Sequence, residues 1–140
     1  MSENDGNLVE VIFDDISYRI GKQEVNETLR VVLSRENKRG VTINIVFTDD
    51  KYMRGLNKNY LGEDRTTDVM SFNIDEEMLG EIYVSLPQAR RQAQERGIPI
   101  KVEIKRLLIH GLLHLLGYDH ASEEEKRLMF AKQEHYLSEV

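Results

Sequence analysis

Apolar positions recur along this chain with two periods, which predicts interleaved strands and helices. Leu8–Phe13 and Val41–Phe47 alternate apolar and polar residues, as strands with one buried face do. A further short strand is predicted at Ile16–Ile20. From Lys22 to Arg39 the apolar residues recur at helical spacing, and Gly40 stands where a helix is expected to stop.

The rest of the chain predicts helices and a pair of short strands. A helix capped by Thr48 or Asp49 is predicted to run to about Asn59, followed by a polar loop over Leu61–Thr66. Two strands are predicted at Thr67–Phe72 and Glu81–Ser85, with an acidic connection around Asp75–Leu79. Three helices follow: one from a Ser85–Gln88 capping box to Arg96, one over Ile100–Leu116, and one from a Ser122–Glu125 capping box to about Ser138. The helix over Ile100–Leu116 is apolar on more than one side, so it is predicted to be the most buried.

This order of elements predicts the α/β (α+β) class: a single domain over residues 1–140, with four to five helices covering a small mixed four-stranded sheet. A content of 40% hydrophobic and 31% charged residues is typical of a globular protein rather than a disordered one. No apolar run approaches the roughly 20 residues of a membrane span. The polar start MSENDGN lacks the pattern of a secretory signal, so a cytoplasmic protein without a membrane partner is expected.

The net charge of −6 argues at first sight against a nucleic-acid partner, because phosphate binding usually accompanies a basic surplus. Basic residues nevertheless outnumber acidic ones between Arg90 and Arg106, just before a histidine-rich stretch. Two interpretations stay open. The segment is either a basic flank that contacts phosphates, with Lys105 and Arg106 foremost, or a solvated helix face of mixed charge.

Three of the four histidines stand within residues 110–120, which read HGLLHLLGYDH. His110 and His114 are four residues apart, so one helix face presents both rings. Gly117 allows a bend that returns His120 toward them. Three imidazoles leave a fourth coordination position for a reactive water, as in catalytic zinc sites. Because the chain has no cysteine, zinc is expected to be held by nitrogen and oxygen alone, with nickel as the alternative.

A histidine pair at this spacing is by itself more often packed in a core than bound to metal, but the glycine and the third histidine at fixed offsets favour a metal site. Metzincin proteases share the ligand spacing and carry a glutamate base directly after the first histidine. Gly111 occupies that position here, so that mechanism lacks its proton acceptor, and the absent side chain would leave room for a ribose phosphate. His135 is expected to be an ordinary surface residue.

The histidine stretch resembles, almost letter for letter, the H-G-x-L-H-L-x-G-Y-D-H motif of the YbeY endoribonucleases, also called rRNA maturation factors. TTDVMSF and GEIYVS are similar to two further blocks of that family. The resemblance implies a metal-dependent, single-strand-specific endoribonuclease that acts in 16S rRNA 3′-end maturation and ribosome quality control in bacteria. It also implies single-stranded rRNA and the small ribosomal subunit as partners, no DNA, and His110, His114 and His120 as metal ligands.

One position departs from the family pattern. An arginine usually stands between an aromatic residue and a glycine ahead of the TDV block, where this chain has Leu61. Arg65, four residues on, is the candidate to reach the same space and contact phosphate. Thr66 replaces the family's customary proline. Ser71 and Tyr118 belong to the family blocks, although core packing would explain both.

Catalytic roles are expected for His114, Asp68 and Arg65. Asp68 and Asp119 are the carboxylates that would orient an imidazole N–H, as partners of metal-bound histidines commonly do. The structural alternatives are a strand-initiating turn at Asp68 and a capped bend at Asp119. With no glutamate base in the motif, hydroxide on the metal would itself attack or activate.

Two other functions stay open on the sequence. A metal-dependent hydrolase of another ester or amide would use the same three ligands. A ribosome-assembly factor would instead hold a structural metal and contact RNA without cleaving it. A substrate screen separates the first from a nuclease, and a cleavage assay separates the second.

Overall fold

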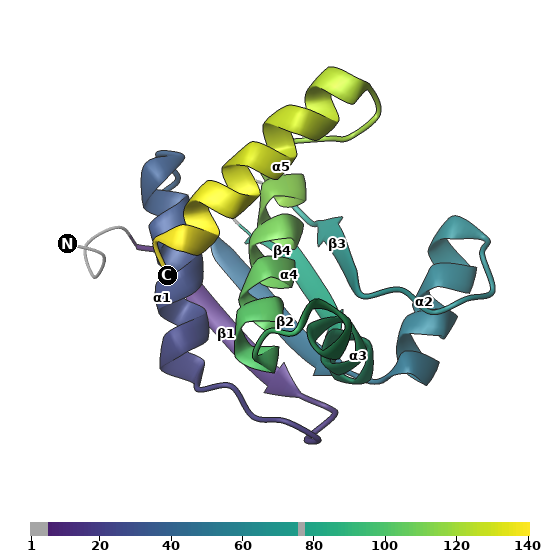
Figure 1. The fold of residues 1–140 in the computed structure, drawn as a ribbon. Coiled ribbons are helices and arrows are strands. Elements are labelled where there is room, and N and C mark those ends of the chain that lie inside the picture. Colours follow the sequence, from purple (N-terminus) through teal and green to yellow (C-terminus); the bar gives the residue numbers. More distant parts are fainter. Residues whose placement is uncertain (1–5, 76–77) are drawn as a thin grey trace.

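Strands and helices interleave along the chain, as the apolar pattern predicts. The computed structural model describes residues 6–75 and 78–140. Within these ranges the elements are β1 (Leu8–Phe13), α1 (Lys22–Arg35), β2 (Thr42–Thr48), α2 (Asp50–Leu61), β3 (Val69–Asn73), β4 (Met78–Ser85), α3 (Leu86–Arg96), α4 (Ile100–Leu115) and α5 (Glu123–Ser138). The predicted α/β class, with a mixed four-stranded sheet covered by helices, is confirmed (Figure 1).

The sheet has the strand order β1-β2-β4-β3, so two strands far apart in the chain, β2 and β4, are central. β1, β2 and β4 are parallel, and β3 runs antiparallel to β4 at one edge. Ile45 of β2 stands opposite Ile82 of β4, and both side chains are fully buried. Because side chains alternate across a strand, these residues define the face that the long helices cover.

α4 is the central helix of the fold and buries more of its residues than any other helix that the structure describes. Figure 1 shows it crossing the front of the sheet, with α1 beside it and α5 lying across its upper end. The prediction that this helix is the most buried is confirmed. Because α4 packs against β3 and β4, the sheet holds its backbone, and the side chains that project from α4 start from fixed positions.

α2 lies apart from this layer and extends to one side of the sheet (Figure 1). Its Tyr52 ring stacks on Tyr83 of β4 with centroids 6.1 Å apart. Tyr83 alternates with the buried Ile82 and Val84, so it faces away from the layer of α1 and α4. As predicted, an aspartate begins this helix: the Asp49 carboxylate accepts a hydrogen bond from the Tyr52 N–H.

The strand predicted at Ile16–Ile20 is wrong, because this stretch is irregular. Its start is a local turn in which the Asp15 carboxylate accepts a hydrogen bond from the Ser17 N–H at 2.8 Å. The helix predicted to run to Arg39 ends earlier, at Arg35. Asn37 adopts a left-handed φ of 58°, and this reversal stops the helix before Gly40.

The capping box predicted at Ser85 is only half formed. Its hydroxyl accepts from the Gln88 N–H at 3.2 Å, but its own N–H donates to the Asp68 carbonyl. The box at Ser122 and Glu125 is complete, as predicted.

Within residues 6–75 and 78–140, no helix is both long and apolar enough to cross a lipid bilayer. The acidic connection predicted around Asp75–Leu79 includes residues 76 and 77, which lie outside the described ranges. Residues 1–5 of the acidic start also lie outside them.

Candidate metal centre

His110 and His114 lie one turn apart in the last two turns of α4, where Gly111 and Leu115 pack on the sheet. Their ring centroids are 4.7 Å apart, and both side chains are half-buried. The four-residue spacing puts both rings on one face, as the sequence predicts. Because α4 is held on the sheet, the backbone beneath the two rings is fixed before any metal binds.

The chain reverses directly after α4 and brings His120 back to the other two histidines. Gly117 has a φ of +102°, a conformation that L side chains rarely adopt, and the Tyr118 N–H closes the turn on the Leu113 carbonyl at 3.0 Å. The His120 ring lies 4.9 Å from that of His114 and 6.2 Å from that of His110.

One potential ligand atom from each of the three histidines lies within 4.8 Å of the other two. Neutral imidazole nitrogens are good ligands for zinc, nickel and related metals. The three rings therefore fit a single transition-metal ion, and the two clefts that these histidines line adjoin the site.

Gln133 of α5 contacts Nδ1 of the His110 ring. The Gln133 Oε1 lies 2.7 Å from Nδ1 of His110, while its amide nitrogen donates to the Glu134 carboxylate at 3.1 Å. With the amide oriented in this way, Nδ1 of His110 is the donor, so Nε2 carries the lone pair that can bind a metal. Sequence reasoning missed Gln133, because nothing in the α5 pattern relates it to a histidine 23 residues earlier.

Burial lowers the pKa of His114, and the His110 and His120 rings lower it further. The Asp119 carboxylate and a hydrogen bond to the Tyr118 backbone oppose this effect without reversing it. A lowered pKa favours the neutral imidazole, which is the form that binds a metal.

Gly111 packs against the sheet and does not face the metal centre. A Cβ at this position would lie 2.8 Å from Cγ2 of Ile82 and 3.0 Å from Oγ of Ser71. The Ser71 hydroxyl also donates to the Gly111 carbonyl at 3.0 Å. The expectation that this glycine leaves room for a ribose phosphate is therefore wrong: it allows α4 to approach β3 and β4, and a glutamate base would not fit there.

The two candidate carboxylates occupy different places. Asp68, just before β3, lines clefts together with His110 and His120, and its Oδ1 accepts from the Val69 N–H at 2.8 Å. Asp119 accepts from the His120 N–H at 2.7 Å, which is the capped bend that the sequence left as the structural alternative. Asp68 thus borders the two clefts while its carboxylate also bonds the backbone where β3 begins, and the group in contact with Nδ1 of His110 is Gln133.

The end of α2 and the loop that follows it place Leu61 and Arg65 differently. Leu61 is 65% exposed and lines a cleft of about 490 Å³ that also contains His110, His114 and His120. Arg65 forms an ion pair with Glu63 at 2.7 Å, and it is absent from the described residues that line the two clefts beside the histidines. The position that the family gives to arginine therefore borders the centre, and here its side chain is apolar.

A half-buried carboxylate directly after α1 supports the loop that carries His120. Glu36 accepts hydrogen bonds from the Tyr118 hydroxyl at 2.9 Å, from Lys132 at 3.0 Å and from Tyr136. Burial alone would raise the pKa of Glu36, but these hydrogen bonds from Tyr136, Lys132 and Tyr118 outweigh it and lower the pKa. Tyr118 has a partner 82 residues earlier in the chain, so its place in the histidine motif is a tertiary one.

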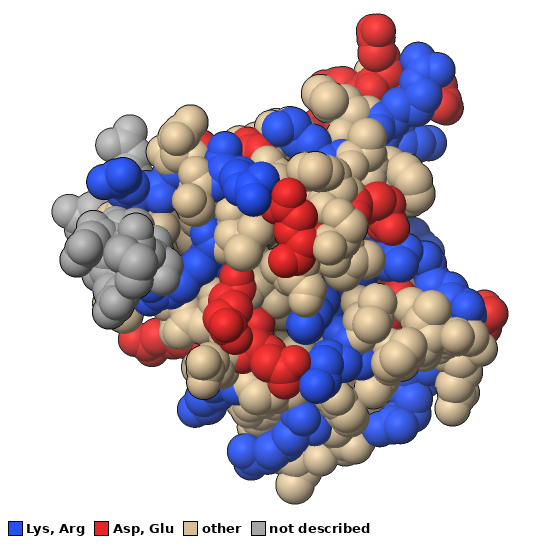
Figure 2. Space-filling model, turned by 60° about the vertical axis from the view of Figure 1, so that its left-hand side comes forward, with Lys and Arg blue, Asp and Glu red and all other residues tan. Residues whose placement is uncertain are grey.

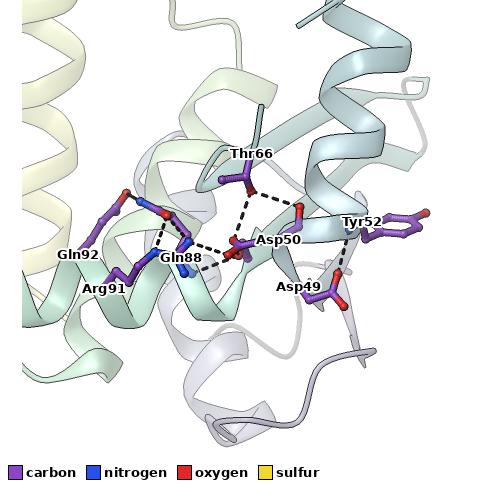
Figure 3. A network of polar contacts seen from close by, with 8 residues as sticks. Asp49, Asp50, Tyr52, Thr66, Gln88, Arg91 and Gln92 are labelled. Atoms are coloured by element: carbon purple, nitrogen blue, oxygen red, sulfur yellow. Dashed lines mark hydrogen bonds and ion pairs between the residues drawn. The ribbon is translucent and has the colours of Figure 1, made fainter. Parts of the chain in front are cut away.

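A second polar network connects α2 with α3 (Figure 3). The Asp50 carboxylate accepts from the Ser85 hydroxyl and from Arg91, both at 2.7 Å, and Thr66 contacts it at 3.3 Å. Gln88 lies beside Arg91 in the same network. These contacts fasten the start of α2 and the end of the following loop to the body of the fold.

Several basic side chains of the segment before the histidines are paired with carboxylates, Glu24 of α1 and Glu103 of the segment itself. Lys101 and Lys105 approach Glu24 at 3.2 and 3.8 Å, and Arg96 approaches Glu103 at 3.7 Å. Figure 2 shows basic and acidic side chains interspersed over one face of the molecule. Lys105 fits neither interpretation in full, because its side chain is only 15% exposed and contacts Glu24 and the Val140 carbonyl, whereas Arg106 lines a cleft beside His110.

His135 lies on the solvent side of α5, with 63% of its side chain exposed and an ion-pair distance of 3.3 Å to Glu139. It is the one histidine outside the metal centre, as the sequence predicts.

Comparison with known proteins gives consistent matches. Residues 12–140 match the family model described as Endoribonuclease YbeY. A Persephonella marina protein named Endoribonuclease YbeY is 43% identical and is aligned over 86% of this chain and 84% of its own length. A Geobacillus thermodenitrificans protein of the same name is 36% identical, over 93% and 95%. The solution structure of a Thermotoga maritima protein is similar with a TM-score of 0.66 and 30% identity, covering 94% of this chain and 87% of that one.

Proposed function

Because this chain belongs to the YbeY endoribonuclease family, we propose that it is a metal-dependent, single-strand-specific endoribonuclease that acts in 16S rRNA 3′-end maturation and ribosome quality control. Its partners are single-stranded rRNA and the small ribosomal subunit, so we place it in the cytoplasm, where ribosomes assemble. Neither DNA nor a membrane is part of this proposal. Residues 1–140 act as one hydrolase domain.

The observation that carries the proposal is the convergence of His110, His114 and His120 at the meeting point of two clefts. Three nitrogen ligands are the donor set of catalytic zinc sites, and zinc is the metal we propose, with nickel as the alternative. When bound, the metal would supply a Lewis acid for a phosphoryl oxygen and an acidified water at neutral pH.

The chain's own residues set up this chemistry. Gln133 fixes the His110 tautomer that presents Nε2 as the ligand atom, and burial lowers the pKa of His114, which favours its neutral, metal-binding form. We assign to Asp68, which lines both clefts, the task of orienting the attacking water and accepting its proton. Arg65 would contact an RNA phosphate after exchanging its exposed ion pair with Glu63, a pair of a kind that contributes little stability.

One observation favours a second candidate. Leu61 borders the centre at the position where the family carries arginine, and a leucine cannot stabilise the charge of a phosphodiester in its transition state. A ribosome-assembly factor that holds a structural metal and contacts rRNA without cleaving it would tolerate this residue.

The deciding experiment incubates purified, metal-loaded protein with a single-stranded rRNA fragment that extends past the mature 16S 3′ end. His114→Ala should abolish cleavage, and His135→Ala, which removes an exposed histidine outside the centre, should retain it. Equal cleavage by the His114→Ala variant would identify a contaminating nuclease. Binding without cleavage by the wild-type protein would support the assembly factor. Elemental analysis of the same preparations identifies the metal.

A further inference from the structure

A cleft of about 470 Å³ opens between α4 and α5, directly beside the metal centre. It shares Asp68, His110 and His120 with the cleft that runs along β3, so the two clefts meet at the histidines. Its remaining walls combine apolar and basic side chains, chiefly those of Arg96, Arg106, Leu107, Lys126, Met129 and Phe130.

The apolar wall ends in an exposed aromatic ring. Met129 and Leu107 are buried, at 2% and 4% exposure, whereas Phe130 is 60% exposed. Exposed aromatic rings beside basic residues are the stacking platforms with which proteins hold single-stranded nucleic acid, since every base has a flat apolar face. The cleft therefore offers a ring next to the place where a phosphodiester would be cleaved.

Lys126 and Arg96, two basic side chains that line the cleft, can exchange their present carboxylate partners for phosphate. Lys126 is 61% exposed and lies 3.8 Å from Glu123, and Arg96 is 49% exposed and lies 3.7 Å from Glu103. The Lys126–Glu123 pair is exposed on both sides and therefore weak, whereas the Glu103 carboxylate is buried and Arg96 approaches it only at long range. The carboxylate of Glu103, which lies in the floor of the cleft, also approaches Arg106 at 3.5 Å and accepts from the Gln92 amide at 2.7 Å, so it keeps these partners when Arg96 turns to phosphate.

We propose that the cleft between α4 and α5 is a nucleotide subsite for the residue next to the cleaved phosphodiester, with its base against Phe130 and its phosphate held by Lys126 and Arg96. This inference rests on the proposed function, because it takes the three histidines as the reaction centre. It gives a physical reason for single-strand specificity: a base inside a duplex is stacked between its neighbours and cannot reach the Phe130 ring.

The absence of tryptophan from the sequence allows a direct test. Phe130→Trp introduces a single fluorophore at the subsite, and Leu128→Trp introduces one on the same helix at a residue that is 54% exposed and does not line the cleft. A single-stranded 2′-O-methyl oligoribonucleotide should quench the fluorescence of the Phe130→Trp variant and leave that of Leu128→Trp unchanged. A duplex of the same sequence should quench neither.

The dissociation constant for single-stranded RNA gives the second measurement. Phe130→Ala should raise the dissociation constant for the single strand about 10-fold. Phe130→Tyr should restore it, and Leu128→Ala should match the wild type. Metal content and melting temperature should stay unchanged in all three variants, because Phe130 is exposed and is not a ligand.

The outcomes separate this inference from the proposed function. If the wild-type protein cleaves RNA while Phe130→Ala binds and cleaves equally well, and RNA leaves the fluorescence of Phe130→Trp unchanged, the subsite is overturned and the nuclease stands. If the wild-type protein cleaves nothing but RNA quenches Phe130→Trp alone, the nuclease falls and the subsite stands.

Discussion

The side-chain oxygen of Gln133 lies 2.7 Å from Nδ1 of His110 and joins α5 to the metal centre on α4. This contact decides which nitrogen of His110 is free to bind a metal. It also explains how the last helix of the chain, which contributes no ligand of its own, supports the site.

Gln133→Ala should weaken metal binding about 10- to 100-fold, because the His110 ring loses the partner that fixes its tautomer and orientation. Competition with a chelating dye measures the affinity. Gln94→Ala, which removes an exposed glutamine on α3, serves as the control and should bind metal like the wild type. An unchanged affinity in Gln133→Ala would show that the contact does not support the ligand.

Gly111→Ala should destabilise the fold by about 1–3 kcal/mol, because its Cβ would press on Ile82 and Ser71. Gly55→Ala is the matched control on α2, where a Cβ would meet nothing within 4 Å. Since alanine is the better helix former, this change should stabilise by about 0.5–1 kcal/mol. Urea unfolding measures both, and the prediction fails if the two substitutions have the same sign.

Metal should stabilise the folded protein, because the three rings meet only there. Zinc in about 100-fold excess over its dissociation constant contributes about 2.7 kcal/mol, a rise of several degrees in melting temperature. Chelation should reverse the rise. His114→Ala should abolish it, whereas His135→Ala should keep it, and a rise of equal size in His114→Ala would place the metal elsewhere.

The lowered pKa of Glu36 predicts a pH dependence of stability. A carboxylate whose pKa is lower in the folded than in the unfolded state contributes stability that is complete above its ordinary pKa of about 4.5 and is lost as the pH falls through the folded value. The free energy of unfolding should therefore fall between about pH 5 and pH 3, more steeply in the wild type than in Glu36→Gln. Glu95→Gln, at an exposed position, should keep the wild-type slope.

Asp50→Asn should loosen α2, which ends at Leu61, because Arg91 and Ser85 lose a charged acceptor. We expect a loss of about 1–3 kcal/mol. Hydrogen exchange should quicken in α2 more than in α4. Asp64→Asn, which breaks an exposed pair with Arg54 at 3.7 Å, should change neither.

The amino-acid sequence by itself determined the elements whose causes are local. The spacing of His110 and His114, the bend at Gly117 and the apolar character of α4 all act within a few residues, so pattern and helix geometry were enough to place the ligands together. The false strand at Ile16–Ile20 and the early end of α1 also have local causes. They depend on the turn at Asp15 and the left-handed Asn37, whose sequence signals are weak.

Only the tertiary structure decided what surrounds the ligands. Gln133 reaches His110 across 23 residues and Glu36 reaches Tyr118 across 82, separations at which sequence periodicity carries no information. The same holds for Gly111: a glycine is required there because two strands pack so closely against it that a Cβ would not fit. Local rules place side chains on a helix face, whereas the partners of those side chains depend on how the helices and strands pack.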